Sequence, residues 1–341
     1  MPVSQPLREP AAALVASACA SRADWVDAAK GIGIVLVVIG HVIDGLMAAH
    51  LADPLGGWPA AYFAIYTFHM PLFFLLAGLF VAPRLAADAG AFVRSAWIRI
   101  AWPYLLWSLV QLAVIDAFGA FVNTPSTLDG ARAVSLLWQP TSQFWFLQAL
   151  LVLHLLGAAL LPRIGVLPFL VLLLGARVLL GWVELPYLIG LPARFGIFYA
   201  AGVALGPRLL ERFALRRPDG AVPMAAAATW LACALPVYLA GLSHWSMAAL
   251  PAALAGTVAV IALAAQPQVS GVWAALGRAS MAIFVLHVLF AAGARIVLHQ
   301  GLGIDQPATL FALACAAGIA GPCLVRDAAR RAGLSRALGL G

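Results

Sequence analysis

The sequence predicts an all-α membrane protein: a polytopic bundle of about ten transmembrane helices with both termini in the cytoplasm. The first observation is composition, since 64% of the 341 residues are hydrophobic and only 10% are charged, which is typical of integral membrane proteins. The second is that the apolar runs are long and lack the two-residue alternation of strands, which favours helices over a closed barrel. The third is that basic residues gather in alternate loops, as the positive-inside rule expects.

Each predicted span is an apolar run that is long enough, or nearly so, to cross the hydrocarbon core of a bilayer. In order along the chain, the spans cover about residues 31–48, 60–82, 100–120, 144–161, 165–182, 193–207, 221–241, 245–265, 277–298 and 306–324. The fifth and sixth are the least regular, because Pro186 and Pro192 crowd their junction. With the N-terminus inside, 16 of the 20 lysines and arginines fall in cytoplasmic segments, and an odd number of spans would break this alternation.

The predicted organisation is one membrane domain, residues 24–325, between two cytoplasmic tails, residues 1–23 and the basic segment 326–341. The run ALVASACA in the first tail is an alternative signal peptide, but only one basic residue, Arg8, precedes it, so a partly disordered tail is the preferred interpretation. No linker or clear internal repeat divides the apolar part. We expect a multi-pass protein of the cell membrane, specifically a bacterial inner membrane.

The net charge of +7 fits this topology. The arginines are scattered between apolar runs, so we expect membrane lipids as the surroundings and no nucleic-acid partner. The four cysteines lack the spacing of metal ligands, so we expect inert packing and no metal site. They are Cys19, Cys233, Cys315 and Cys323.

Histidines in the middle of predicted spans are the first candidates for function. His41 follows Lys30, the only lysine, by eleven residues, so it lies ~16 Å above it, near the bilayer midplane. His69 is in the antiparallel second span, and it lies about as far from the outer face as His41 does. Ionisable residues at this depth usually face the bundle interior or a watery cavity and mark function. For His154 and His287, which are also mid-span, a structural role is the preferred interpretation.

The chemistry of these residues suggests an acid–base site near a phosphate-binding site. Burial favours the neutral form of the His41 imidazole, which can accept the proton of a hydroxyl that attacks an activated carbonyl. Asp44, one turn later, is placed to orient it. Arg94 and Arg99 have forked donors that suit phosphate, although anchoring at the cytoplasmic face is the alternative.

Other catalytic motifs are missing from the sequence. It has neither the GxSxG of serine hydrolases nor the HExxH of zinc proteases. The glycines of KGIGI, residues 30–34, lack the GxGxxG spacing of a dinucleotide loop, so close helix packing is expected of them.

Five segments in order resemble acyltransferase family 3, the multi-pass membrane acyltransferases, over about residues 22–325. They are RADWVDAAKGIGIVLVVIGH, TFHMPLFFLLAGLF, IRIAWPYLLW, FWFLQALLVLHLL and LGRASMAIFVLHVLF. The AKGIGI variant is similar to the fucose 4-O-acetylase-like branch. The resemblance implies transfer of an acyl group, usually acetyl, from cytoplasmic acyl-CoA to a hydroxyl of a carbohydrate, such as an envelope or lipid-linked glycan. It implies acyl-CoA as a donor substrate and no permanently bound cofactor.

The resemblance also implies roles for single residues at the start of the chain. His41 matches the family's catalytic histidine and Lys30 its basic partner. Arg22 and Asp24 match the polar entry to the first span. Arg99 matches the second arginine of the family's Arg-x-x-Arg pair. The first position of that pair is Ala96, so Arg94 is expected to substitute for it from one turn earlier.

The resulting hypothesis places the phosphates of CoA on Arg99, Arg94 and Lys30, with His41 as general base or acyl carrier. His69 or Trp145 is expected to line the cavity, and His287 to bind substrate or support the site. The rival is a secondary transporter of a sugar or lipid-linked glycan, because buried histidines and broken helices occur there too. A membrane scaffold without chemistry fits the mid-bilayer imidazoles poorly.

Overall fold

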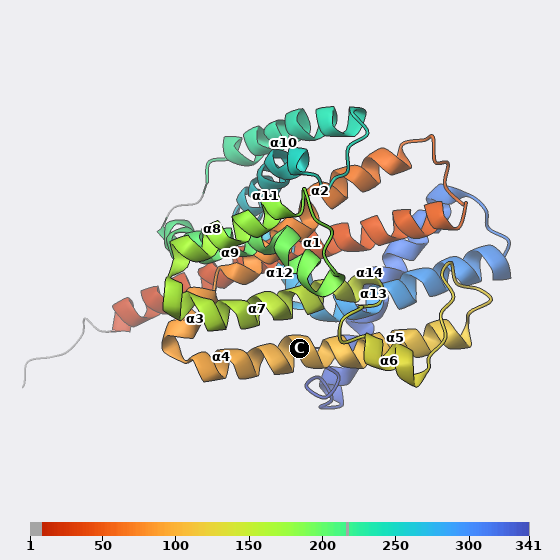
Figure 1. The fold of residues 1–341 in the computed structure, drawn as a ribbon, viewed down its shortest axis with the longest axis horizontal. Helices are drawn as coiled ribbons and strands as arrows, with labels where there is room; N and C mark the ends of the chain where they lie inside the picture. The colour runs from red at the N-terminus through yellow and green to blue at the C-terminus, as the bar shows by residue number, and fades with distance from the viewer. Residues whose placement is uncertain (1–8, 216–217, 341) are drawn as a thin grey trace, which may run out of the picture.

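The computed structural model describes residues 9–215 and 218–340, and over these residues it is a bundle of helices without a strand (Figure 1). The helices of the first part are α1 (Glu9–Ala48), α2 (Trp58–Gly78), α3 (Val81–Ala87), α4 (Ala89–Ala96), the π-helical turn η1 (Trp97–Ala101), α5 (Trp102–Ala117), α6 (Gly130–Ser135), the 3₁₀ turn η2 (Ser142–Phe144) and α7 (Trp145–Ile164). Those of the second part are α8 (Val166–Leu179), α9 (Tyr187–Leu215), α10 (Ala221–Leu239), the 3₁₀ turn η3 (Met247–Ala249), α11 (Leu250–Ala264), α12 (Ser270–Arg278), α13 (Ser280–Ile296), the π-helical turn η4 (Val297–Gly301) and α14 (Pro307–Arg331).

Nine helical segments of the described chain are long and apolar enough to cross a membrane, so the protein is a multi-pass membrane protein. They are Asp24–Ala48, Trp58–Ala87, Ala89–Ala117, Ser142–Ile164, Tyr187–Arg212, Ala221–Leu239, Met247–Ala264, Ser280–Gly301 and Pro307–Arg331. The predicted span 165–182 is represented by α8, which has 14 residues and is therefore ~21 Å long, less than a ~30 Å hydrocarbon core. The predicted number of ten holds only if this short helix is counted.

Two predicted boundaries are wrong by several residues. The third span begins at Ala89 rather than near residue 100, because α4, η1 and α5 join end to end after the N-cap of Asp88. The Asp88 carboxylate accepts a hydrogen bond from the Ala91 amide at 2.9 Å. The sixth span begins at Tyr187, since Pro192 lies inside α9 instead of before it. Membrane helices tolerate an internal proline when neighbours satisfy the freed carbonyl.

Both predicted tails contain helical residues that continue the neighbouring span. Residues 1–8 lie outside the described part of the chain, but from Glu9 onward the backbone is helical and continues into the first span. At the other end, α14 extends to Arg331, beyond the predicted domain end at 325. The segment after it folds back, and Leu340 is buried. The C-terminal residues are thus part of the packed structure.

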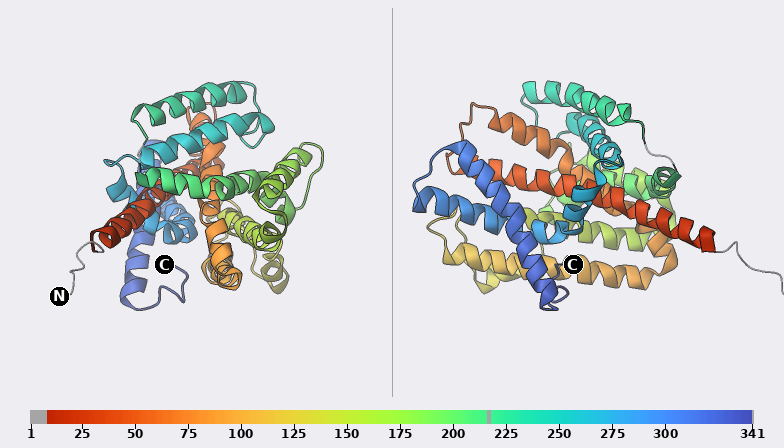
Figure 2. Two further views of the ribbon diagram at one scale, coloured as in Figure 1. Left: turned by 90° about the vertical axis from the view of Figure 1, so that its left-hand side faces the viewer. Right: turned by 180° about the vertical axis from the view of Figure 1, so that it is seen from behind.

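Helix α1 runs through the centre of the bundle and contacts α2, α9, α11, α12, α13 and α14. Figure 1 shows α10 and α11 on one side of it and α4 and α5 on the other. Figure 2 shows α14 crossing the bundle obliquely, which brings the end of the chain towards α4 and α5. Residues of α1 are therefore positioned to face several neighbouring helices at once.

Glycines determine how closely the central helices approach. A Cβ added at Gly31 of α1 would lie 2.7 Å from a backbone carbonyl carbon of α12, and one at Gly277 of α12 would lie 2.5 Å from that of Asp27. Gly78 of α2 and Gly202 of α9 face each other's backbones in the same way. Small residues at such positions let membrane helices pack backbone to backbone. The helix-packing interpretation of KGIGI is confirmed for Gly31.

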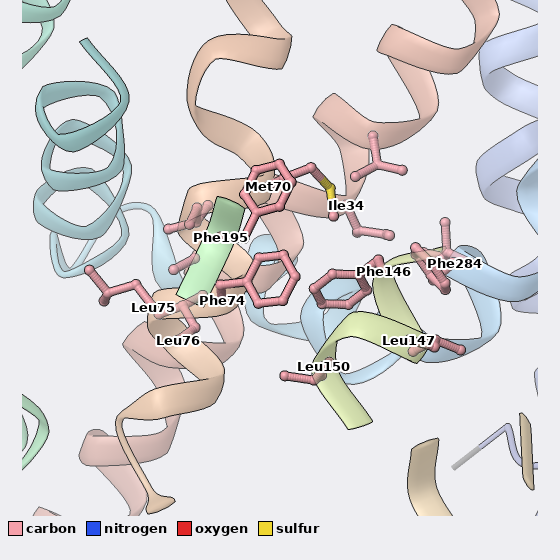
Figure 3. Packing of buried hydrophobic residues seen from close by; sticks show 14 of the residues in the cluster. Ile34, Met70, Phe74, Leu75, Leu76, Phe146, Leu147, Leu150, Phe195 and Phe284 are labelled. Carbon is pink, nitrogen blue, oxygen red and sulfur yellow. The ribbon is translucent and has the colours of Figure 1, made fainter. Parts of the chain in front are cut away.

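The hydrophobic core lies between α1, α2, α7, α9 and α13. Figure 3 shows Phe74 of α2 beside Phe146 of α7, with Ile34 and Met70 next to them and Phe284 further along. The ring centroids of Phe74 and Phe146 are 5.0 Å apart, and those of Phe146 and Phe284 are 5.5 Å apart. Both are edge-to-face contacts, which aromatic pairs favour.

Candidate active site

One stripe of α1 lines two cavities in succession. Lys30, Ile34 and Val37 line a cavity of about 740 Å³, and one turn later His41 and Asp44 line a second cavity of about 650 Å³. The spacing of three and four residues places all five side chains on one face of the helix. We call the first the inner cavity and the second the outer cavity, since their lining loops come from the predicted cytoplasmic and external sides. A single helix thus connects two sites of different chemistry.

The inner cavity is strongly basic. Its lining contains five cationic side chains and one carboxylate: Lys30, Arg94, Arg99, Arg278 and Arg336, and Asp27. The only ion pair in this set joins Lys30 Nζ to Asp27 Oδ1 at 3.4 Å. Four guanidinium groups are therefore left for an anionic ligand, and their planar donors suit phosphate.

Two of these arginines were expected, and two were not. Arg94 and Arg99 line the cavity together, whereas Ala96 is buried in the core with 3% exposure. Arg94 therefore lies at a cavity that position 96 does not line, and its expected substitution for an arginine at position 96 stays a prediction. Arg278 and Arg336 were not singled out in the sequence. Both lie in predicted cytoplasmic segments, where the positive-inside rule already explains an arginine. The sequence therefore gave no separate indication that they belong to a binding site.

The C-terminal segment forms a wall of the inner cavity. The indole Nε1 of Trp107 donates to the Leu338 carbonyl at 2.8 Å, and that of Trp102 donates to the Ala337 carbonyl at 2.8 Å. These bonds attach residues 332–340 to the start of α5 and place Arg336 at the cavity. Since α5 and this segment are more than 200 residues apart, sequence patterns gave no sign of this contact.

The deep end of the inner cavity is apolar. Ile34 and Val37 of α1, Phe146 of α7 and Phe284 of α13 line it, as does Met70 of α2. Figure 3 shows four of these side chains within the core around Phe74. A ligand with an anionic head and a long thin tail would match this change from basic entrance to apolar end.

His41 of the outer cavity belongs to a histidine pair that the sequence did not predict. His41 lines this cavity, and its ring lies 5.1 Å from the ring of His287, centroid to centroid. The Nδ1 of His287 donates to the carbonyls of Ile283 at 3.0 Å and Phe284 at 2.8 Å. Because a carbonyl only accepts, the Nδ1 carries the proton and the neutral ring keeps an unprotonated Nε2. This Nε2 is buried without a hydrogen-bond partner among the described residues.

His69, the predicted partner of His41, lies one ring further away. Its Nδ1 donates to the Ile65 carbonyl at 2.8 Å, and its ring contacts Tyr66 at 4.6 Å. Tyr66 in turn lies 6.2 Å from His41, centroid to centroid. His69 is buried and lines neither cavity. The structure therefore groups His41 with His287 directly and with His69 through Tyr66.

Asp44 shares the outer cavity with His41, but the two side chains make no hydrogen bond. The expected orientation of His41 by Asp44 is not present, since Asp44 is exposed to the cavity one turn along the helix. The sequence also missed Gln111, which lines this cavity and exchanges two amide hydrogen bonds with Gln143, at 2.9 and 3.3 Å. A polar amide inside a predicted span was the signal available.

The remaining predicted residues lie elsewhere. Trp145 lines neither cavity, and it packs in an aromatic cluster with Phe195 at 5.2 Å. His154 donates to the Leu150 carbonyl at 3.0 Å and stacks on another ring, which are the contacts of a packed side chain. Asp24 is exposed and outside both cavities, and the side chain of Arg22 lies outside the described residues.

A third histidine lies near Tyr66, besides His41 and His69. His244, in the segment between α10 and α11, lies 5.5 Å from the Tyr66 ring. Burial, reinforced by the Arg194 guanidinium, lowers the pKa of His244 to about 4. His244 is therefore neutral at physiological pH.

The family comparison agrees with this architecture. The model of an acyltransferase domain family matches residues 23–327, nearly the whole chain. No curated protein and no solved structure matches the chain. The matched range contains the first eight spans, most of the ninth and, apart from Arg336, every cationic residue of the inner cavity. The chain is a multi-pass membrane acyltransferase and belongs to acyltransferase family 3.

Proposed function

We propose that the protein is an O-acyltransferase of the cell membrane, which moves an acyl group, most often acetyl, from cytoplasmic acyl-CoA to a hydroxyl of a carbohydrate or envelope glycan. The observation that carries the proposal is the stripe of α1. It leads from the cations of the inner cavity, through Ile34 and Val37, to His41 in the outer cavity. A donor from one side and an acceptor from the other would meet at His41.

The inner cavity supports acyl-CoA as the donor. Its four free guanidiniums offer phosphate contacts at the entrance, and the apolar end suits the pantetheine arm with its thioester. A transporter of a neutral sugar would have no use for such a cluster at one entrance. The basic-to-apolar gradient therefore favours the acyltransferase over a transporter of a neutral sugar.

His41 is the proposed general base. Its imidazole takes the proton of the acceptor hydroxyl while the oxygen attacks the thioester carbonyl, so that a C–O bond forms and the C–S bond breaks. The proton then passes from the imidazolium to the departing CoA thiolate. His287 keeps an unprotonated Nε2 and lies 5.1 Å from His41, ring to ring, so it is placed to stabilise the imidazolium that forms. An acyl-histidine intermediate on His41 is the two-step version of the same transfer.

The test is a comparison of two mid-span histidines in purified protein reconstituted with acetyl-CoA. We expect His41→Ala to lower acyl transfer by ~10²–10⁴-fold, the usual effect of removing a general base. His154→Gln is the matched control, since His154 lines neither cavity, and it should keep most of the activity. Both variants should retain thermal stabilisation by acetyl-CoA.

Two results would reject the proposal. Near-normal turnover in the His41→Ala variant would exclude the catalytic role. A wild-type protein that is neither stabilised by acetyl-CoA nor able to consume it would exclude acyl-CoA as the donor, and the transporter would become the better interpretation.

A further inference from the structure

Arginines in the outer half of a membrane protein are not explained by the positive-inside rule, so their positions call for another explanation. Four of the 20 basic residues lie outside the predicted cytoplasmic segments: Arg132, Arg177, Arg194 and Arg295. Two of them hold the segment before α11. Arg177 donates to the carbonyls of Trp245 at 2.5 Å and Ser246 at 3.1 Å, and Arg194 lies 5.1 Å above the Trp245 ring. The other two line the outer cavity.

Arg132 is held in place by the protein. Its guanidinium donates to Ser135 Oγ at 2.9 Å, to the Gln139 carbonyl at 3.3 Å and to Thr141 Oγ1 at 2.7 Å. All three acceptors are neutral, so its charge stays uncompensated. This guanidinium forms a fixed positive wall of the cavity.

Arg295 has no such support. It is only 6% exposed, yet no hydrogen bond or ion pair joins it to any residue that the structure describes. Its side chain lines the outer cavity. A buried, unpaired charge is costly, and buried charges are normally paired. Because its side chain lines the cavity, the partner of Arg295 comes from what occupies that cavity, water or a bound anion.

The distance from Arg295 to the reacting centre suits a sugar. Arg295 follows His287 by eight residues on α13, which is ~12 Å along the helix axis, and His287 lies beside His41. A group bound at Arg295 is thus about one or two sugar units from a hydroxyl at His41. Asp44 is the carboxylate in this cavity, and it makes no ion pair with either arginine.

We propose that the acceptor carries an oxyanion, a carboxylate or a phosphate, within one or two sugar units of the acylated hydroxyl, and that Arg295 binds this group. The inference rests on the proposed acyl transfer and narrows its acceptor from any carbohydrate to an acidic one. Arg295 sets the specificity and the position of the acceptor, whereas His41 acts on its hydroxyl.

The experiment uses the full-length protein, labelled acetyl-CoA and the glycan fraction from the envelope of the producing cell as acceptor. The fraction is offered untreated, with its carboxyl groups reduced to alcohols, and after removal of its phosphates. At low acceptor concentration, we expect the wild-type protein to label the untreated glycan at least about tenfold faster than one of the treated fractions. This ratio is the one expected when a charge-assisted hydrogen bond to the acceptor is lost. The fraction that fails identifies the oxyanion as carboxylate or phosphate.

Variants of Arg295 connect this preference to the residue. Arg295→Gln should raise the acceptor KM about tenfold or more and abolish the preference, while the KM for acetyl-CoA stays unchanged. Arg295→Lys, which keeps the charge, should keep part of the preference. His299→Gln in η4, just after α13, is the control, because His299 Nδ1 lies 2.8 Å from Asp305 Oδ1 and the side chain lines neither cavity. Stabilisation by acetyl-CoA shows that each variant is folded.

The possible failures can be told apart. Equal labelling of all three fractions by the wild-type protein overturns the acidic acceptor and leaves the acyl transfer standing. An Arg295→Gln variant that keeps the full preference overturns the role of Arg295. No labelling of any fraction, together with no consumption of acetyl-CoA, rejects the proposed function itself, and the inference falls with it.

Discussion

Replacing Gly277 by alanine should separate the two helices that form the floor of the inner cavity. A Cβ at this position would lie 2.5 Å from the Asp27 carbonyl carbon and 3.0 Å from its Cα. The Asp27 carbonyl oxygen lies closer still. Ordinary van der Waals contact begins near 3.4 Å, so α1 and α12 must move apart by more than ~0.9 Å, and a packed interior transmits this strain. The obstacle is backbone, which cannot rotate away as a side chain can. Overpacking of this kind typically costs ~1–3 kcal/mol.

Gly271→Ala is the matched control on the same helix, because its added Cβ would meet nothing within 4 Å. There the better helix propensity of alanine should stabilise the protein by up to ~1 kcal/mol. The two substitutions therefore have opposite expected signs, and the measurement is the free energy of unfolding in mixed micelles.

The same displacement should weaken donor binding, since Gly277 lies next to Arg278 and both line the inner cavity together with Lys30. We expect the KM for acetyl-CoA to rise in the Gly277→Ala variant and the acceptor KM to stay the same. If Gly277→Ala were as stable as Gly271→Ala, the backbone contact between α1 and α12 would not be present in the protein, and the description of the inner cavity would be wrong.

Two further predictions concern the C-terminal segment and the response to pH. Arg336→Gln should raise the KM for acetyl-CoA about 3- to 10-fold, because it removes one cation from the inner cavity. Arg331 is an exposed arginine outside that cavity, so Arg331→Gln should leave this KM unchanged. If the two variants had equal KM values for acetyl-CoA, the C-terminal segment would not be part of the donor site. His244 has its pKa lowered to about 4 in the folded state against ~6.5 in the unfolded chain, so between pH 6.5 and 4 the unfolded state binds more protons and stability falls as the pH falls. His244→Gln should flatten this decline in unfolding experiments across that range, and an unchanged pH dependence would contradict the burial of the imidazole.

The sequence by itself determined the membrane character, the helices and the residues of α1. These depend on local patterns, since an apolar run of sufficient length must be helical in lipid, whatever surrounds it. Lys30 and His41 were predicted for the same reason: both lie on one helix, so the helical rise alone relates them. The errors at residues 89–100 and 187–193 came from prolines and polar residues, which mark a helix end in water more reliably than in a membrane.

Only the tertiary structure decided which helices face each other. The sequence paired His41 with His69 by depth, but depth does not specify the rotation of a helix or its neighbour, and the packing places His287 beside His41 instead. It also brings Arg278 and Arg336 to Arg94 and Arg99. These contacts arise where glycines let backbones approach, and they join segments far apart in the chain. No local pattern records them, because in lipid the helix surfaces are uniformly apolar and shape, rather than hydrophobicity, selects the partner.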